Sequence, residues 1–143
     1  MKSVFLFWIL GAIDGHAKNF SLKIGSQGRY TLCPLYDVMS AYPMTAKRQI
    51  EWQELKMAMS LRGKKRHYLW STIQLRHWFA MANKCQFSQI IMQEIIEEAL
   101  DNMENVINHV MQIIPSHFPE KIFDSIFLGM RKVKNRCVKS LNK

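Results

Sequence analysis

The apolar residues of the C-terminal half recur at three- and four-residue steps, and this period constrains the fold more than any other feature. Ser88 can cap a helix that runs to Ile114, where Pro115 ends it. Pro119 stands near the start of a last helix, where its missing N–H costs nothing. The apolar stripe of the first of these helices comprises Ile91, Ile95, Leu100, Met103, Ile107, Val110 and Met111. That of the last helix comprises Ile122, Phe123, Ile126, Phe127, Met130, Val133 and Cys137.

The segment before these helices also has helical features. Residues 50–59 carry apolar side chains at helical spacing, and Ser71 with Gln74 forms a capping box for a helix to about Ala82. No internal repeat, low-complexity tract or linker divides the 143 residues, which suffice for one core. We therefore predict one mainly α domain.

The N-terminus contains a short apolar run. Lys2 followed by residues 4–10 resembles the start of a secretory signal, but no A-x-A-like cleavage site follows, and Asp14 comes soon after the run. A bilayer span would need about 20 apolar residues. We predict instead a buried helix that ends at Gly11, because glycine adopts the left-handed closing conformation.

A β-hairpin is predicted near residues 21–33. Residues 21–24 and 29–32 alternate polar and apolar side chains, as half-buried strands do. Residues 25–28, which begin and end with glycine, supply the turn between them. Pro34 ends the second strand.

The loop before this hairpin carries a dense set of polar side chains within residues 11–20. Pairing of the strands should bring Asn19, just before the first strand, close to Asp37, a few residues after the second. A carboxylate and an amide oxygen suit Mg²⁺, and Asp14 is a separate carboxylate that could accept a hydroxyl proton. Asp and Asn are also common turn residues that bond their own backbone, so this alternative stays open.

The order of these residues matches the order of parts in protein kinases. In kinases a catalytic-loop Asp is followed by four residues and an Asn, and a later Asp binds the metal. Asp14 and Asn19 have that spacing, and Asp37 follows after the hairpin. This spacing with the hairpin between indicates phosphoryl transfer.

The sequence then resembles one kinase family closely. Residues 14–21 (DGHAKNFS), 34–40 (PLYDVMS) and 54–59 (ELKMAM), with the two terminal helices, are similar to HipA-type serine/threonine kinases, the toxins of bacterial toxin–antitoxin pairs. The resemblance implies the helical C-terminal lobe of a HipA-like, protein-kinase-like fold over residues 1–143. The lobe would comprise a catalytic loop at 11–20, a metal-binding segment at 34–40 and a helical bundle at 50–143.

The resemblance also implies a role for each polar side chain of the two motifs. The site would consist of catalytic Asp14 and Lys18, the Mg²⁺ ligands Asn19 and Asp37, and the ATP contacts His16 and Tyr36. Ala12 departs from the pattern, since the family usually has Asn there.

The resemblance further implies partners. The family phosphorylates hydroxyls of proteins, including aminoacyl-tRNA synthetases, and a DNA-binding, HipB-like antitoxin restrains it. DNA would then be reached only through the antitoxin, and no membrane would be involved. We expect the N-terminal, nucleotide-binding lobe to be absent from this chain, and the chain therefore to be inactive until another chain or a missing upstream segment supplies that lobe. We also expect Phe7 and Trp8 to contribute to an exposed apolar patch that this lobe would cover.

The composition adds weaker constraints and keeps two alternatives open. A formal charge of +9 favours anionic partners. The chain could be a basic, nucleic-acid-binding helical domain that uses residues 62–66 and the last helix, or a non-catalytic remnant or partner-binding module of a truncated gene. Cys33, Cys85 and Cys137 form no C-x-x-C pair, so a reducing cytoplasm is the simplest setting.

Overall fold

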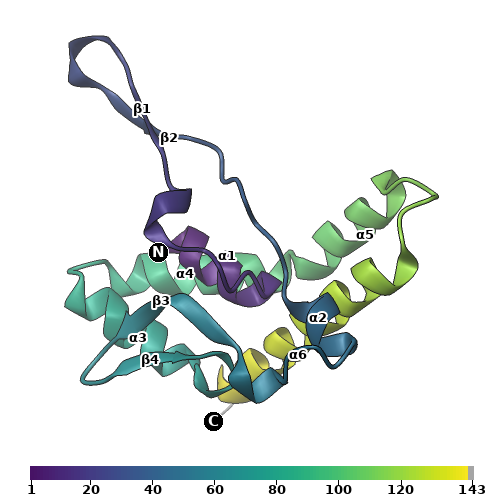
Figure 1. Cartoon of the computed structure of the whole chain (residues 1–143). Helices are drawn as coiled ribbons and strands as arrows, with labels where there is room; N and C mark the ends of the chain where they lie inside the picture. Colours follow the sequence, from purple (N-terminus) through teal and green to yellow (C-terminus); the bar gives the residue numbers. More distant parts are fainter. Residues whose placement is uncertain (142–143) are drawn as a thin grey trace.

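Helices and two separate antiparallel hairpins make up the chain in a computed structural model, which describes residues 1–141 (Figure 1). The prediction of a mainly α fold is confirmed. In chain order the elements are α1 (Lys2–Leu10), β1 (Leu22–Ile24), β2 (Tyr30–Leu32), α2 (Tyr42–Ala46), β3 (Lys56–Arg62), β4 (Arg66–Leu69), α3 (Leu75–Lys84), α4 (Gln89–Asp101), α5 (Met103–Ile113) and α6 (Glu120–Leu141).

Helix α1 lies at the centre of the core. Phe5 and Trp8 are fully buried, and both rings pack against Trp78 of α3. The helix ends, as predicted, at Gly11, which has a φ of 71° and donates to the carbonyls of Phe7 and Trp8. The expectation that Phe7 and Trp8 are exposed is wrong, because Gly15 and Phe20 of the following loop cover Phe7 and the helical core of this chain covers Trp8.

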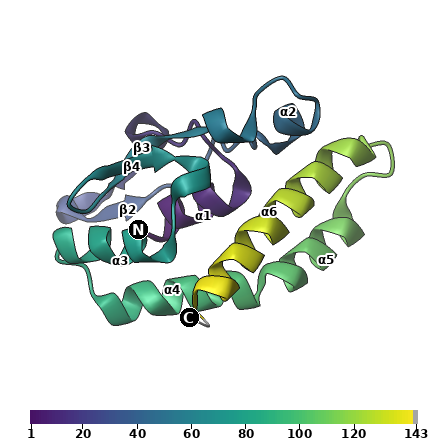
Figure 2. The same cartoon turned by 90° about the horizontal axis from the view of Figure 1, so that it is seen from below.

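Helix α6 runs along α5 and reaches α1 and α2 (Figure 2). Its predicted inward face is confirmed, since Phe127, Met130, Val133 and Cys137 are buried. A two-point ion pair joins α6 to α5, with Arg131 Nη2 2.7 Å from Glu104 Oε2. The guanidinium lowers the pKa of the Glu104 carboxyl.

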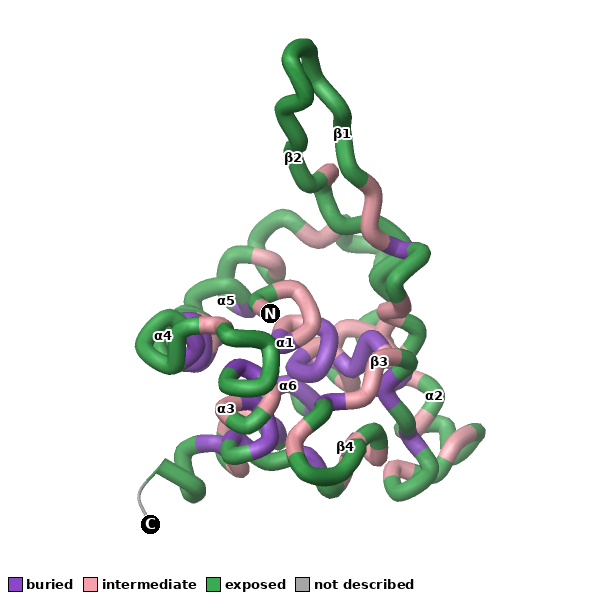
Figure 3. Tube along the Cα trace, turned by 90° about the vertical axis from the view of Figure 1, so that its left-hand side faces the viewer, coloured by how far each residue is buried: buried purple, intermediate pink, exposed green. Residues whose placement is uncertain are grey.

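The hairpin formed by β1 and β2 stands away from the rest of the molecule (Figure 3). Its register pairs Leu22 with Leu32 and Ile24 with Tyr30, so the predicted hairpin is confirmed. The predicted half-burial is wrong, because these apolar side chains are all more than half exposed. None of the described residues forms a packed layer on either face of this hairpin.

The predicted helix at residues 50–59 is wrong, because residues 52–54 form a short 3-10 turn and a strand begins at Lys56. Residues 56–62 are β3, which pairs with β4 across a short basic turn. Leu55, Met57 and Leu61 are buried while Lys56 and Ala58 are exposed. A short apolar run with a spacing of two residues also fits a helical period, so the sequence alone does not separate the two structures.

Two predicted helix boundaries also differ. Helix α3 begins after Gln74, which makes the capping box with His77, while Ser71 lies in the preceding turn. Ser88 caps α4 as predicted, accepting from the Ile91 N–H at 3.3 Å. The long helix expected to reach Ile114 breaks at Asn102, whose side chain donates to the Glu98 carbonyl. Two residues of its predicted apolar stripe, Ile91 and Met111, are exposed.

The buried His77 should make the stability of the fold depend on pH. Burial lowers the pKa of His77, and His67, stacked on it with ring centroids 3.7 Å apart, lowers it further. The unfolded chain therefore binds more protons than the folded chain, so the free energy of unfolding decreases as pH falls through about 6.5, the ordinary histidine pKa. We expect the urea midpoint to decrease between about pH 7 and about pH 5.

A His77→Gln variant separates this contribution from other titrations. Glutamine is a favourable residue at this capping-box position, so the start of α3 is retained. Its urea midpoint should depend less on pH than that of the parent chain, whereas exposed His109→Gln should behave like the parent. Equal pH dependence in the His77→Gln and parent chains would contradict the assignment.

Candidate functional site

The polar loop is held in place by the end of α1. The Ala12 N–H donates to the Phe7 carbonyl at 2.9 Å, and Ala12 is buried. Gly15 lies directly against the Phe7 ring, where any Cβ would overlap it. The loop then closes in a short 3-10 turn at Ala17–Asn19. Because Gly15 has no side chain, the loop can lie against the Phe7 ring. This contact sets the positions of the neighbouring residues Asp14 and His16.

Asn19 and Asp37 are in direct contact, as the hairpin predicted. Asn19 Nδ2 donates to Asp37 Oδ2 at 3.0 Å across the open end of the hairpin. Asn19 is 2% exposed, whereas the Asp37 residue is exposed. Asp37 has a φ of 56°, a left-handed conformation that Asp and Asn tolerate better than most residues. A buried amide and an exposed carboxylate are thus held in contact at the base of the hairpin.

Tyr36 fastens the same two segments together. Its hydroxyl donates to the Lys18 carbonyl at 3.0 Å and lies 2.8 Å from Ser21 Oγ. The Cys33 N–H donates to the Ser21 carbonyl at 2.9 Å. These bonds hold residues 18–21 against residues 33–37, so the Tyr36 hydroxyl acts as a clamp at the base of the hairpin.

The other predicted site residues lie in the loop itself. The Asp14 side chain is 65% exposed, and its Oδ1 is 3.9 Å from His16 Nε2. His16 Nδ1 is buried without a hydrogen-bond partner, and Lys18 is exposed. Among the described residues no hydrogen bond joins the Asp14 carboxylate to Asn19 or Asp37. The structure therefore brings Asn19, Asp37 and Tyr36 together and leaves the Asp14 carboxylate free toward solvent.

The chemistry of these donors fits a hard cation shared with a phosphate. Amide and carboxylate oxygens are the ligands that Mg²⁺ takes, and Mg²⁺ usually keeps water or substrate phosphates as further ligands. Within residues 1–141 no group of three or more His, Cys, Asp or Glu side chains is placed to hold a metal by itself. A metal at Asn19 and Asp37 would therefore depend on oxygens brought by a ligand.

Comparison with known protein families shows to which family the chain is related. The family described as HipA-like C-terminal domain matches residues 1–107. The chain belongs to this family. The match includes the polar loop, the hairpin and the Asp37 segment, and it ends within α5.

Solved structures show the same fold for this HipA-like domain. The toxin–antitoxin complex of HipA, HipB and operator DNA from Shewanella oneidensis MR-1 contains a similar chain, with a TM-score of 0.69 and 18% identity. The similarity covers 96% of the present chain and 29% of that chain. In all, 17 chains of solved structures match. The present chain thus spans less than a third of the relative's length.

Two features of the site were missed in the sequence. The Tyr36 clamp and the contact of Gly15 with Phe7 both join segments that are not adjacent along the chain. The sequence carried a signal for the Tyr36 clamp, since a tyrosine directly before Asp37 can reach the strand opposite it.

The basic residues 62, 64, 65 and 66 are exposed at the β3–β4 turn, away from these contacts. No helix in residues 1–141 is both long and apolar enough to cross a bilayer.

Proposed function

We propose that this HipA-like domain is the catalytic part of a serine/threonine kinase of a toxin–antitoxin system, which transfers the γ-phosphate of ATP to a protein hydroxyl. The 3.0 Å contact between Asn19 and Asp37 carries the proposal, because an amide and a carboxylate, groups that suit Mg²⁺, meet there beside the loop that contains Asp14. Phosphoryl transfer depends mainly on positioning and on charge stabilisation, and this arrangement can supply part of both.

Each side chain of the site has a role in the proposal. Asp14 accepts the proton of the substrate hydroxyl, and its exposure lets a protein substrate reach it. Asn19 and Asp37 hold Mg²⁺, and the exposed Lys18 offsets the charge of the phosphate. His16 and the ring of Tyr36 contact the nucleotide. Bound Mg–ATP would supply the phosphoryl group and a cation that neutralises its charge.

A second part of the kinase must hold the rest of the nucleotide. Kinases use a glycine-rich loop and a Lys–Glu pair for this purpose. The present chain spans 29% of the Shewanella HipA chain. We propose that a nucleotide-binding part, on the same or on another chain, completes the site, and that residues 1–143 alone transfer no phosphate.

The partners follow from the same proposal. The Shewanella relative was solved with HipB and operator DNA. We propose a HipB-like antitoxin as the protein partner, with DNA bound through it, and a protein substrate such as an aminoacyl-tRNA synthetase. The exposed carboxylate of Asp14 is consistent with a macromolecular hydroxyl donor.

Metal binding at the hairpin base can be tested without activity. Mn²⁺–ATP, whose paramagnetic ion takes the same oxygen ligands as Mg²⁺, should broaden the NMR signal of the Asn19 side-chain amide in residues 1–143. Asp37→Asn removes the charge while tolerating the positive φ, and it should reduce this broadening about tenfold at a fixed low concentration.

The matched control is Asp124→Asn, which removes an exposed carboxylate from α6. In this variant Mn²⁺–ATP should broaden the Asn19 side-chain amide signal as much as in the parent chain. Broadening that persists unchanged in Asp37→Asn would show that the metal does not bind at this pair, and the proposed function would lose its main support.

A further inference from the structure

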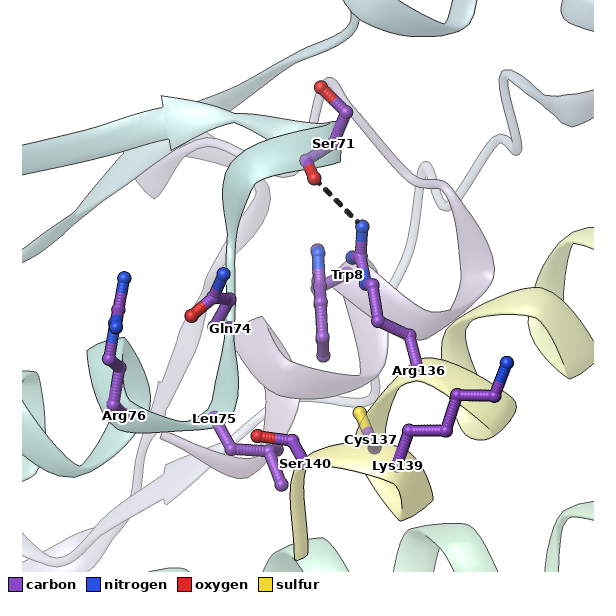
Figure 4. A pocket seen from close by; sticks show the side chains of 9 residues that line it. All are labelled: Trp8, Ser71, Gln74, Leu75, Arg76, Arg136, Cys137, Lys139 and Ser140. Carbon is purple, nitrogen blue, oxygen red and sulfur yellow. Dashed lines mark hydrogen bonds between the residues drawn. The ribbon is translucent and has the colours of Figure 1, made fainter. Parts of the chain in front are cut away.

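A cavity lies at the C-terminal end of α6 (Figure 4), and this end of the helix is remote from the β1–β2 hairpin (Figure 1). Its volume is about 460 Å³, and none of the site residues described above lines it. Its walls come from α1, the turn before α3, the start of α3 and the last turns of α6. The lining residues are Trp8, Ser71, Gln74, Leu75, Arg76, Arg136, Cys137, Lys139 and Ser140.

The charged side chains of this cavity are all cations. Arg76 lies at the start of α3, and Arg136 and Lys139 lie on α6, while no Asp or Glu is among the lining residues. None of these three cations makes an ion pair among the described residues. In Figure 4 Arg76 and Lys139 lie on opposite sides of the view with the Arg136 guanidinium between them, and the Lys139 ammonium points away from Arg76. Gathering cations without a carboxylate raises their mutual repulsion, which a bound anion would relieve.

Arg136 is fixed at the floor of the cavity. Its Nη1 donates to the Ser71 carbonyl at 2.9 Å, and its guanidinium lies 5.2 Å from the centre of the Trp8 ring. Burial of the guanidinium lowers the pKa of Arg136. The carbonyl and the ring orient the guanidinium but leave its full charge without a counter-ion.

Two N–H donors beside this charge have no acceptor. Arg136 Nε and Trp8 Nε1 are both buried without a hydrogen-bond partner, and Trp8 is 0% exposed. In Figure 4 the ring nitrogen of Trp8 lies at the end nearest Ser71 and the Arg136 guanidinium. Unpartnered buried donors are costly and rare in native structures. An anionic oxygen at the cavity floor would provide the acceptor that both donors lack.

The start of α3 adds a further positive potential. This helix is ten residues long, and its N-cap Gln74 and first residue Leu75 line the cavity. The N-terminal end of a helix carries a partial positive charge and favours anions. The helix end, the unpaired cations and the acceptor-free donors therefore all favour the same type of ligand.

We propose that this cavity binds the phosphate group of a small phosphorylated molecule. Arg136 supplies the charge at the floor, and the positive charges of Arg76 and Lys139 at the two sides of the cavity add to its potential. Arginine and lysine are the usual phosphate-binding side chains. The cavity is larger than a phosphate ion alone needs, so a small phosphate ester also fits. This site is independent of the proposed kinase site, because the two share no residue.

The indole N–H signal of Trp8 in ¹⁵N-resolved NMR spectra tests the proposal on residues 1–143. Titration with inorganic phosphate and, separately, with glycerol 3-phosphate should shift this signal in a saturable manner. The indole N–H of Trp78, which is also unpartnered but does not line the cavity, should not move. Tighter binding of glycerol 3-phosphate would identify an ester as the ligand, and equal binding would identify the phosphate group alone.

The variant Arg76→Gln/Lys139→Gln removes two exposed cations and leaves Arg136 with its structural bonds. It should raise the dissociation constants of both phosphate and glycerol 3-phosphate about tenfold or more, because favourable charge interactions with the ligand are lost. Lys121→Gln, on the same helix but outside the cavity, should bind like the parent chain. No shift of the Trp8 signal, or equal binding by the double variant, would overturn the proposal.

Discussion

An Asp14→Asn variant should lose phosphoryl transfer by about 10²- to 10⁴-fold, the contribution typical of a positioned general base. The assay uses a chimera in which the N-terminal part of Shewanella HipA precedes residues 1–143, with ³²P transfer from ATP to protein as the measurement. Asparagine has nearly the same shape as aspartate but cannot accept the hydroxyl proton. Because the Asp14 side chain is 65% exposed, its replacement should leave the free energy of unfolding nearly unchanged.

Two further chains complete this test. Asp124→Asn in the same chimera should retain full transfer, since it removes a carboxylate from α6 rather than from the loop. Residues 1–143 alone should show no transfer. Transfer by the chimera that is insensitive to Asp14→Asn would remove the catalytic assignment, and a folded chimera without any transfer would favour the non-catalytic alternative.

A Tyr42→Ala variant should reduce the free energy of unfolding by about 3–5 kcal/mol, as loss of a large buried ring does. The Tyr42 ring is 1% exposed and stacks on Trp52 with centroids 5.5 Å apart. It also packs against Gly129 of α6, where a Cβ would overlap it. The ring therefore fills the contact between α2 and α6. Urea unfolding followed by circular dichroism measures the loss.

The hydroxyl of Tyr42 accounts for a smaller part of this effect. It donates to the Ile9 carbonyl at 2.9 Å, and burial raises the pKa of Tyr42 far above its ordinary value. Tyr42→Phe keeps the ring, so it should cost only about 1–3 kcal/mol through the buried carbonyl left without its partner. A Tyr42→Ala variant no less stable than Tyr42→Phe would contradict the packing role of the ring.

The long periodic helices could be predicted because their burial pattern repeats over many turns. The inward face of α6 follows directly from the spacing of its apolar residues, and Gly11 marks the end of α1. Residues 50–59 could not be assigned in the same way, because a short run such as Leu55–Leu61 fits both periods. Tertiary pairing with β4 selects the strand. The break at Asn102 depends on one side-chain bond to a carbonyl, which no periodicity reports.

The candidate site was predictable where it depends on strand pairing. Antiparallel strands joined at residues 25–28 bring their outer ends together, so the contact of Asn19 with Asp37 followed from the pattern. The positions of Asp14 and Lys18 relative to this pair did not follow, because loop geometry depends on contacts such as Gly15 with Phe7. Their catalytic roles stay predictions for the same reason.

The isolated position of the β1–β2 hairpin has a thermodynamic consequence for any ligand of Asn19 and Asp37. A two-stranded hairpin without a packed face is marginally stable in water, so its ends are held together mainly by the Asn19–Asp37 and Tyr36 bonds. A ligand that bridges Asn19 and Asp37 binds only the paired form, and its apparent affinity decreases with the population of that form. A second molecule that docks on the exposed apolar strands would raise that population and so strengthen the binding of such a ligand without touching Asn19 or Asp37.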